Sequence, residues 1–251
     1  MRNIYIISSD YHVPFHNKPL LKGMLELIQD LEPKLAGFYI LGDFMDINSL
    51  SFHDKGKMPI NSTISLEYEY YEGNKVLDQL DNVLGNKIKK YYLWGNHEDR
   101  AKRHFNTVDG RKLGWGTLSP TTQLNLKERK YIVKEDWKED YFKLGKFLEL
   151  SHGQFTNIHT AKKHLDVFKA SCMFGHTHRV QSFMEGNMMS FNIGHMADEN
   201  TPAFSYASRS MKKLHLNAFA IVTLDSKGYF YTNLVTCYNN RFYYNGKKYG
   251  V

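Results

Sequence analysis

The stretch "FGHTHR" (residues 174–179) places two histidines, His176 and His178, two positions apart, directly after a short apolar run and a glycine. In a strand, residues i and i+2 point to the same side. Two imidazoles that leave the end of a strand on one side can share a single target. For this stretch alone the alternative is a solvated loop with two surface histidines, and the rest of the chain decides between the two interpretations.

Polar side chains follow several other apolar runs that predict strands. These positions are Asp10 and His12 in "SDYH", Asp43 and Asp46 in "LGDFMD", Asn96 and His97 in "WGNHED", and His152 in "LSHG". In open α/β sheets, ligand sites lie beyond the carboxyl ends of the strands. The strand ends would therefore deliver candidate ligands to one edge of the structure.

A single Asp or Asn after a strand is usually a helix cap or a turn residue. A turn does not require histidines beside the carboxylates, so the joint occurrence favours a metal site. Mixed His, Asp and Asn ligands suit a hard or borderline divalent ion rather than a thiolate site. The ligands outnumber those of one tetrahedral ion. Two ions are the natural interpretation, and paired ions clamp the attacking and leaving oxygens of an in-line displacement at phosphorus.

Strand and helix patterns alternate along the first part of the chain, and strand patterns dominate the rest. We predict strands at residues 3–9, 36–42, 87–95, 146–153, 170–177, 180–185, 188–194, 218–225, 229–238 and 241–249, and helices at 20–31, 62–84 and 157–168. This alternation predicts an α/β fold with covered sheet faces. The less regular stretch 106–140 reads as an insertion or cap, and we expect one domain over residues 1–251.

The composition is that of a globular chain, with 251 residues of which 42% are hydrophobic and 24% charged. Its two cysteines, Cys172 and Cys237, form no disulfide framework and fit a reducing compartment. No apolar stretch approaches membrane-spanning length, and the first residues do not resemble a signal peptide. We expect a cytoplasmic protein without a membrane partner, in the host cytoplasm if it is viral. The oligomeric state stays open.

The net charge of +7 is uneven, because residues 201–251 contain seven Lys or Arg and a single acid, Asp225. A basic surface attracts phosphates. The alternative is a surface that serves solubility alone. We expect this segment to complete the second sheet of the domain, which would bring its charge near the site.

The ordered blocks resemble the motifs of the calcineurin-like metallophosphoesterases, which are D-x-H, G-D-x-x-D, G-N-H-[ED], a later H, and G-H-x-H. All five occur here in order from Asp10 to His178, and the resemblance covers roughly the first 200 residues. "GNHEDR" together with "FGHTHR" resembles a subgroup common in phages and prophages. The resemblance implies a four-layer α/β/β/α sandwich around two mixed β-sheets.

The resemblance also implies roles for individual residues. One ion would be held by Asp10, His12 and His178, the second by Asn96, His152 and His176, and Asp43 would bridge both. His97 would lie by the leaving group and contact the substrate, Asp46 would orient a histidine, and Arg100 is a candidate for binding substrate phosphate. The expected metal is Mn²⁺, with Fe, Zn, Ni or Mg as alternatives. An ion-bound hydroxide would attack phosphorus without a covalent enzyme intermediate.

The substrate class is less specified. "GDFMDIN" lacks the Arg-Gly of Ser/Thr protein phosphatases, and "GNHED" differs from the "GNHD" of cyclic-nucleotide phosphodiesterases. We predict a phosphodiesterase that acts on nucleotides or nucleic acid, in the latter case a nuclease. The alternatives are a phosphomonoesterase with a nucleotide or protein substrate, a catalytically silent scaffold, and a nucleic-acid-binding module.

Overall fold

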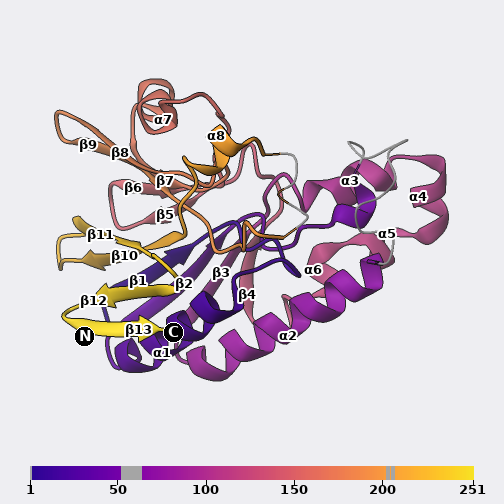
Figure 1. Ribbon diagram of the computed structural model, residues 1–251, viewed down its shortest axis with the longest axis horizontal. Coiled ribbons are helices and arrows are strands. Elements are labelled where there is room, and N and C mark those ends of the chain that lie inside the picture. Colours follow the sequence, from indigo (N-terminus) through magenta and orange to yellow (C-terminus); the bar gives the residue numbers. More distant parts are fainter. Residues whose placement is uncertain (1, 52–63, 202–203, 205–206) are drawn as a thin grey trace.

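Two main β-sheets stack face to face in the computed structural model, which describes residues 2–51, 64–201, 204 and 207–251 (Figure 1). The six-stranded sheet has the order β11 (Phe230–Thr236), β10 (Ala218–Leu224), β1 (Ile4–Ser8), β2 (Leu35–Leu41), β3 (Lys89–Leu93) and β4 (Tyr131–Lys134). The five-stranded sheet has the order β5 (Phe142–Leu144), β6 (Leu148–Leu150), β7 (Ser171–Phe174), β9 (Met188–Ile193) and β8 (Val180–Glu185). Both sheets are mixed: β1, β2, β3 and β4 run parallel, whereas β10 is antiparallel to β1.

Helices cover the outer faces of both sheets and complete four layers. The long helices α1 (Lys18–Leu31) and α2 (Leu66–Leu84) cover the six-stranded sheet, and α7 (Thr160–Phe168) covers the five-stranded one (Figure 1). Successive strand residues point to opposite faces. In β1, Ile6 therefore packs under the helices while Ile7 packs against the other sheet. This is the α/β/β/α sandwich that the sequence predicts.

The helix boundaries follow from capping residues. The Asn17 side chain accepts a hydrogen bond from the Leu20 N–H at 3.0 Å, which starts α1 two residues before the predicted range 20–31. Ser65 caps α2 in the same way through the Tyr68 N–H at 3.1 Å. Residues 62 and 63, which begin the predicted second helix, lie outside the described residues.

The stretch 106–140, predicted as an insertion or cap, contains short helices and one strand of the main sheet. The short helices are α4 (Val108–Leu113), α5 (Trp115–Leu118) and α6 (Pro120–Gln123), and they follow α3 (Asp99–Phe105). They lie together at one end of the molecule, away from the five-stranded sheet (Figure 1). The strand β4 then pairs with β3 at the sheet edge, and the chain crosses to β5 in the second sheet.

The prediction that residues 201–251 complete the second sheet is wrong. Strand β10 pairs with β1 in the first sheet, with Ile221 opposite Ile6, and β11 pairs with β10. The physical reason lies in the apolar run of β10, which is buried on both faces: Phe219 contributes to the core under the helices and Val222 to the core between the sheets. A strand of this kind needs cover on both sides, and the position beside β1 provides it.

The predicted strand at 241–249 is a two-stranded hairpin of β12 (Arg241–Tyr244) and β13 (Lys247–Gly250). Asn245 and Gly246 form its turn with φ values of 46° and 79°, as the hairpin signal Asn-Gly requires. The hairpin packs on α1, where Lys247 donates to Asp30 and Tyr249 donates to Asp30 at 2.8 Å. Asp30 lies in the last turn of the 14-residue α1, about 18 Å along the axis from the first turn. The charge of Lys247 therefore lies far from the carboxyl end of β1, where α1 begins.

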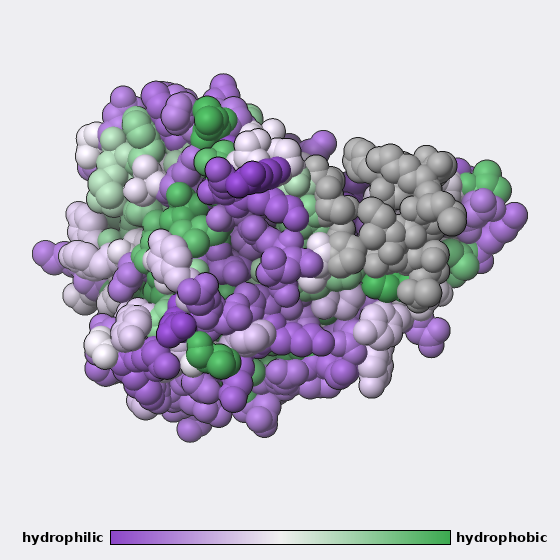
Figure 2. All heavy atoms as spheres, viewed as in Figure 1, coloured by the Kyte–Doolittle hydropathy of each residue, from purple (hydrophilic) through white to green (hydrophobic). Residues whose placement is uncertain are grey.

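Over α1 and α2 the outer surface is largely hydrophilic (Figure 2). A stripe of apolar residues on the opposite side of α1, including Leu20, Met24, Leu27 and Ile28, is fully buried. Within the described part of the chain, no helix has the length and apolar character needed to cross a membrane.

We predict that Gly23→Ala destabilises the protein although alanine favours helices. A Cβ at Gly23 would lie 2.8 Å from the backbone N of Gly250, so the hairpin would have to move away from α1. Overpacking of this kind destabilises a protein by about 1–3 kcal/mol, which exceeds the stabilisation that alanine provides through its higher helix propensity. Urea unfolding should show a lower midpoint. In the control Gly116→Ala the new Cβ meets nothing within 4 Å, and the midpoint should stay the same or rise slightly through helix propensity. A Gly23→Ala protein as stable as the parent would contradict this packing.

Candidate metal centre

The carboxyl ends of strands from both sheets meet at one edge and bring the predicted ligands together. Three overlapping groups of side chains have ligand atoms within 4.8 Å of one another: Asp10, His12 and His178; His12, Asp43 and His97; and Asp43, His152 and His176. Asp10 and His12 follow β1, Asp43 follows β2, and His97 follows β3. His152 follows β6, and His176 and His178 follow β7. That these residues bind metal stays a prediction, but their convergence is a property of the structure.

The first group has two imidazole nitrogens that face each other. The Nε2 atoms of His12 and His178 lie 3.0 Å apart, and Asp10 Oδ1 lies 3.5 Å from His178 Nε2. Nδ1 of His12 lies 3.0 Å from Asp46 Oδ1 and donates to it, which leaves a lone pair on Nε2 of the neutral ring. Burial opposes ionisation of Asp10, but the hydrogen bond and charge of His178 lower the Asp10 pKa to about 2. A cation between these atoms satisfies the carboxylate and the facing nitrogens together.

The third group surrounds His152. Its Nδ1 donates to the Leu41 carbonyl at 2.8 Å, so Nε2 is directed at Asp43 Oδ2, 3.3 Å away, and Asn96 Oδ1, 3.1 Å away. A lone pair that faces two oxygens is repelled unless a proton or a cation lies between them. Burial lowers the pKa of His152, but Asp43 more than offsets this and raises it to about 9. Nδ1 of His176 is buried and, among the described residues, has no hydrogen-bond partner, so it can serve as a ligand.

The backbone at these positions is unusual. The φ values of Asp10, His12, Asp43, His176 and His178 are 54°, 51°, 47°, 70° and 59°, in the left-handed region. Non-glycine residues rarely adopt this conformation, and each one costs about 1–3 kcal/mol. Such strain persists where the surrounding structure imposes it, and it clusters at functional sites.

Two glycines let the backbone pass against the buried carboxylates. A Cβ at Gly95 would lie 2.1 Å from Asp43 Oδ1, and one at Gly175 would lie 2.1 Å from Asp10 Oδ2. Any side chain at either position would displace a candidate ligand. These glycines therefore belong to the construction of the centre, although neither of them contributes a ligand atom.

Glu98 is a functional residue to which the sequence analysis assigned no role. It is fully buried, and its carboxylate accepts hydrogen bonds from the N–H groups of Asp43, Met45 and Gly95 at 3.0, 3.0 and 2.8 Å, and from the Tyr92 hydroxyl at 2.9 Å. Burial and the neighbouring Asp43 charge raise the Glu98 pKa. The carboxylate ties the end of β2 to the end of β3. In the sequence, Glu98 was marked only as the acid directly after "GNH".

His97, Asp46 and Arg100 form a connected group beside the ligands. His97 Nδ1 donates to the Asp46 carbonyl at 2.8 Å, and Asp46 Oδ1 lies 3.1 Å from the same nitrogen. Asp46 also contacts His12, so one carboxylate is placed to orient two histidines. Arg100 donates to the Asp46 carbonyl at 2.9 Å and lies 3.1 Å from His97 Nε2. Arg100 thus lies at the centre, held against His97.

A second set of histidines beyond His178 was also missed. His195 follows β9 with its ring centroid 5.0 Å from that of His178. Glu199 Oε1 lies 2.9 Å from His195 Nε2 and 3.2 Å from His215 Nδ1. Burial lowers the pKa of His195, although Glu199 opposes the shift. In the sequence, His195 was marked only by a Gly-His pair that follows a strand, as in "FGHTHR".

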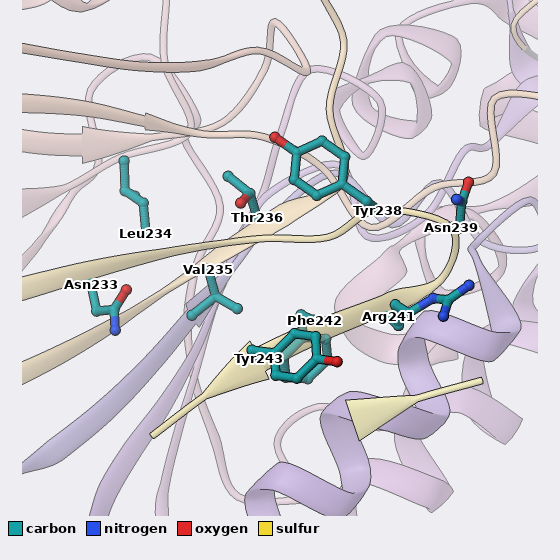
Figure 3. Close-up of a pocket in the computed structure, with 9 residues that line it drawn as sticks. All are labelled: Asn233, Leu234, Val235, Thr236, Tyr238, Asn239, Arg241, Phe242 and Tyr243. Carbon is teal, nitrogen blue, oxygen red and sulfur yellow. The ribbon is translucent and has the colours of Figure 1, made fainter. Parts of the chain in front are cut away.

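A surface hollow of about 480 Å³ lies apart from this centre, between β11 and β12 (Figure 3). It is lined by Asn233, Leu234, Val235, Thr236, Tyr238, Asn239, Arg241, Phe242 and Tyr243. None of these residues belongs to the groups that bring ligand atoms together. The residues that the sequence predicts as metal ligands therefore lie at the strand ends and not in this hollow.

Comparisons with known proteins show similarity at the level of the fold. No family model matches the chain, and no curated protein matches it. Among solved structures it is similar to Vacuolar Protein Sorting 29 from Cryptosporidium parvum, with 13% identity, a TM-score of 0.51 and coverage of 99% of this chain and 98% of that chain. This likeness shows that the two proteins share a fold, and the two mixed sheets with helices on their outer faces are as predicted.

Two further structures are less similar. One is Vps29 from Entamoeba histolytica in complex with Zn²⁺, with 12% identity, a TM-score of 0.45 and coverage of 93% of this chain and 98% of that chain. The other, from Streptococcus pneumoniae, is described as a predicted phosphoesterase, with 14% identity, a TM-score of 0.40 and coverage of 100% of this chain and 99% of that chain.

We predict that Glu98→Gln destabilises the fold. The amide replaces one acceptor oxygen by an NH₂ group, which then faces backbone N–H donors. A buried donor left without an acceptor costs about 1–3 kcal/mol. Urea unfolding in the presence of chelator measures this loss without a contribution from bound ions. The exposed Glu128→Gln is the matched control, and equal midpoints for the two variants would refute the structural role of Glu98.

Proposed function

We propose that this chain is a metal-dependent phosphoester hydrolase that holds two divalent ions in the overlapping ligand groups. The observation that carries the proposal is the position of Asp43, which lies in two of the three groups, with His12 on one side and His152 and His176 on the other. A carboxylate with histidines on both sides is suited to bridge two ions. A single ion would leave one of these groups without a partner.

The ligand set fits the metals expected from the sequence. Asp10, His12 and His178 would hold one ion, and Asn96, His152 and His176 the other. The two cysteines are buried elsewhere, and the donors are oxygen and imidazole, which suits Mn²⁺, with Fe, Zn, Ni or Mg as alternatives. When bound, such ions polarise phosphoryl oxygens and lower the pKa of a coordinated water.

Three side chains of the protein would then act on the substrate or position the residue that does. Nε2 of His97 lies 3.8 Å from Asp43 Oδ2, and the His97 side chain is 17% exposed whereas that of Asp43 is 2% exposed. His97 therefore stands on the solvent side of the centre, and Nε2 could carry a proton for the leaving-group oxygen once Arg100 no longer donates to it. Asp46 fixes its Nδ1, and Arg100 can turn from His97 to a phosphoryl oxygen.

We propose phosphodiesters of nucleotides or nucleic acid as the substrates. Support comes from helix α3, which begins at the end of the third ligand block and brings Arg100 and Arg103 to the centre. Arg103 donates to the Asn96 carbonyl at 3.1 Å. The basic C-terminal hairpin supports the proposal less, because Lys247 pairs with Asp30 at the far end of α1. A silent scaffold would not need seven ligand-type side chains that converge at one edge of the sheets, and a nucleic-acid-binding module would not need metal.

The first test of this proposal combines metal analysis with hydrolysis. We expect the Mn²⁺-loaded protein to contain about two equivalents of metal and to cleave bis(p-nitrophenyl) phosphate faster than p-nitrophenyl phosphate, with loss of activity after chelation. Asp43→Ala should lose most of both ions, whereas the exposed Asp109→Ala should keep them. Full metal content in Asp43→Ala would refute the bridge, and faster cleavage of the monoester would favour a phosphomonoesterase.

A second prediction concerns His97. His97→Ala should retain its metal but lose about 10²–10⁴-fold in rate, because a general acid or base contributes on that scale. The loss should grow as the pKa of the leaving group rises, since poor leaving groups need the proton most. The exposed His159→Ala serves as control. A rate loss that is the same for all leaving groups would indicate that His97 acts only through electrostatic stabilisation.

A further inference from the structure

Trp137 forms an aromatic wall beside His152 and His176, in the third ligand group. Its ring centroid lies 6.1 Å from that of His152 and 5.9 Å from that of His176. Trp137 is partly exposed, whereas His152 is fully buried. The indole therefore contributes solvent-accessible aromatic surface beside a buried ligand group.

The loop that carries Trp137 is held in place by its own hydrogen bonds. The Asp136 carboxylate accepts from the N–H groups of Lys138 and Glu139 at 3.1 and 3.2 Å, and the Asp140 N–H donates to the Asp136 carbonyl at 2.8 Å. The Gln154 side chain donates to the Lys138 carbonyl and so ties the loop to the strand end that carries His152. A wall fixed in this way loses little conformational entropy when a ligand stacks on it.

The first ligand group differs in this respect. Its aromatic neighbour, Phe204, has ring centroids 5.6 Å from His12 and 5.4 Å from His178, but it is only 1% exposed. Phe204 packs inside the protein, whereas Trp137 is partly exposed. Lys138 Nζ lies over the Trp137 ring, 5.4 Å from its centroid, so a base that stacks on this face would take the place of a flexible, exposed lysine side chain.

We propose that Trp137 is a stacking platform for a nucleobase whose phosphate lies at the metal centre. This inference rests on the proposed function and narrows its substrates to nucleotides and nucleic acids with an unpaired base. In a nucleotide, one sugar separates the phosphate from the base. A base on Trp137 thus leaves its phosphate within reach of His152 and His176, and Lys138 can meet a second phosphate. Stacking on an aromatic side chain tolerates any base, because every base has a π-face.

Two esters with the same leaving group test this inference. Thymidine 5′-(p-nitrophenyl phosphate) and methyl p-nitrophenyl phosphate differ only in the nucleoside, so their ratio of kcat/KM reports its contribution. We expect Trp137→Leu to lower this ratio by about 5- to 150-fold, through KM, because base stacking contributes on that scale. Trp137→Phe should lose less, since it keeps a ring. The control Trp115→Leu should keep the ratio, because Trp115 packs against Trp94 and Phe105 in the short-helix region.

Binding without turnover supplies an independent measurement. With Mg²⁺ present, adenosine 5′-monophosphate should quench tryptophan fluorescence in the parent and in Trp115→Leu but not in Trp137→Leu, and ribose 5-phosphate should quench none of them. An unchanged ester ratio and unchanged quenching in Trp137→Leu would overturn the inference. If the parent cleaves neither ester, the proposed function fails, and the fluorescence titration alone decides whether Trp137 stacks bases.

Discussion

The negative charge of three buried carboxylates is the constraint on which the rest of the centre depends. Asp10, Asp43 and Asp46 are almost completely buried, and although burial opposes their ionisation, neighbouring histidines lower the pKa of each. Nearby carboxylates raise the pKa of His12 and His152, but burial lowers that of His176 and His178 to about 4 and about 3. Buried charge without a partner is costly, so these carboxylates depend on the imidazoles whose ligand atoms lie within 4.8 Å of Asp10 and Asp43. Divalent cations held by the same atoms would stabilise the carboxylates further.

The fold concentrates these charges because both sheets end their strands at the same edge. Left-handed turns at Asp10, Asp43 and His178 reverse the chain directly after the strands, and the glycines opposite the carboxylates leave room for this. Glu98 then joins two strand ends through backbone N–H groups. These strained turns and close approaches cost conformational energy. The packed layers on both sides are rigid enough to keep the backbone in these conformations.

The sequence predicted what depends on local pattern and missed what depends on tertiary position. The ligand blocks were readable because histidines and carboxylates follow apolar runs at strand ends. The sequence could not predict which sheet β10 joins, because an apolar strand that is buried on both faces fits either sheet. Glu98 and His195 have local sequence signals that give no role, and only the structure shows Glu98 under the Asp43 backbone and His195 against His178. The turn at Asn245 and Gly246 was readable but was passed over within a long strand pattern.

The two sides of the centre differ, and this difference sets the direction from which a substrate would approach. On the side of His178, buried Phe204 and His195 close the ligand group against the protein. His97 and Trp137 both reach the solvent, His97 beside His12 and Trp137 beside His152 and His176. A phosphoester that enters between them would meet a proton donor at one end and an aromatic surface at the other. The difference between the two ends has a simple origin in the chain. The block "GNHED" places His97, which can form hydrogen bonds, and the loop between β4 and β5 places Trp137, which can stack, at the solvent-exposed edge of the same buried cluster of charged residues.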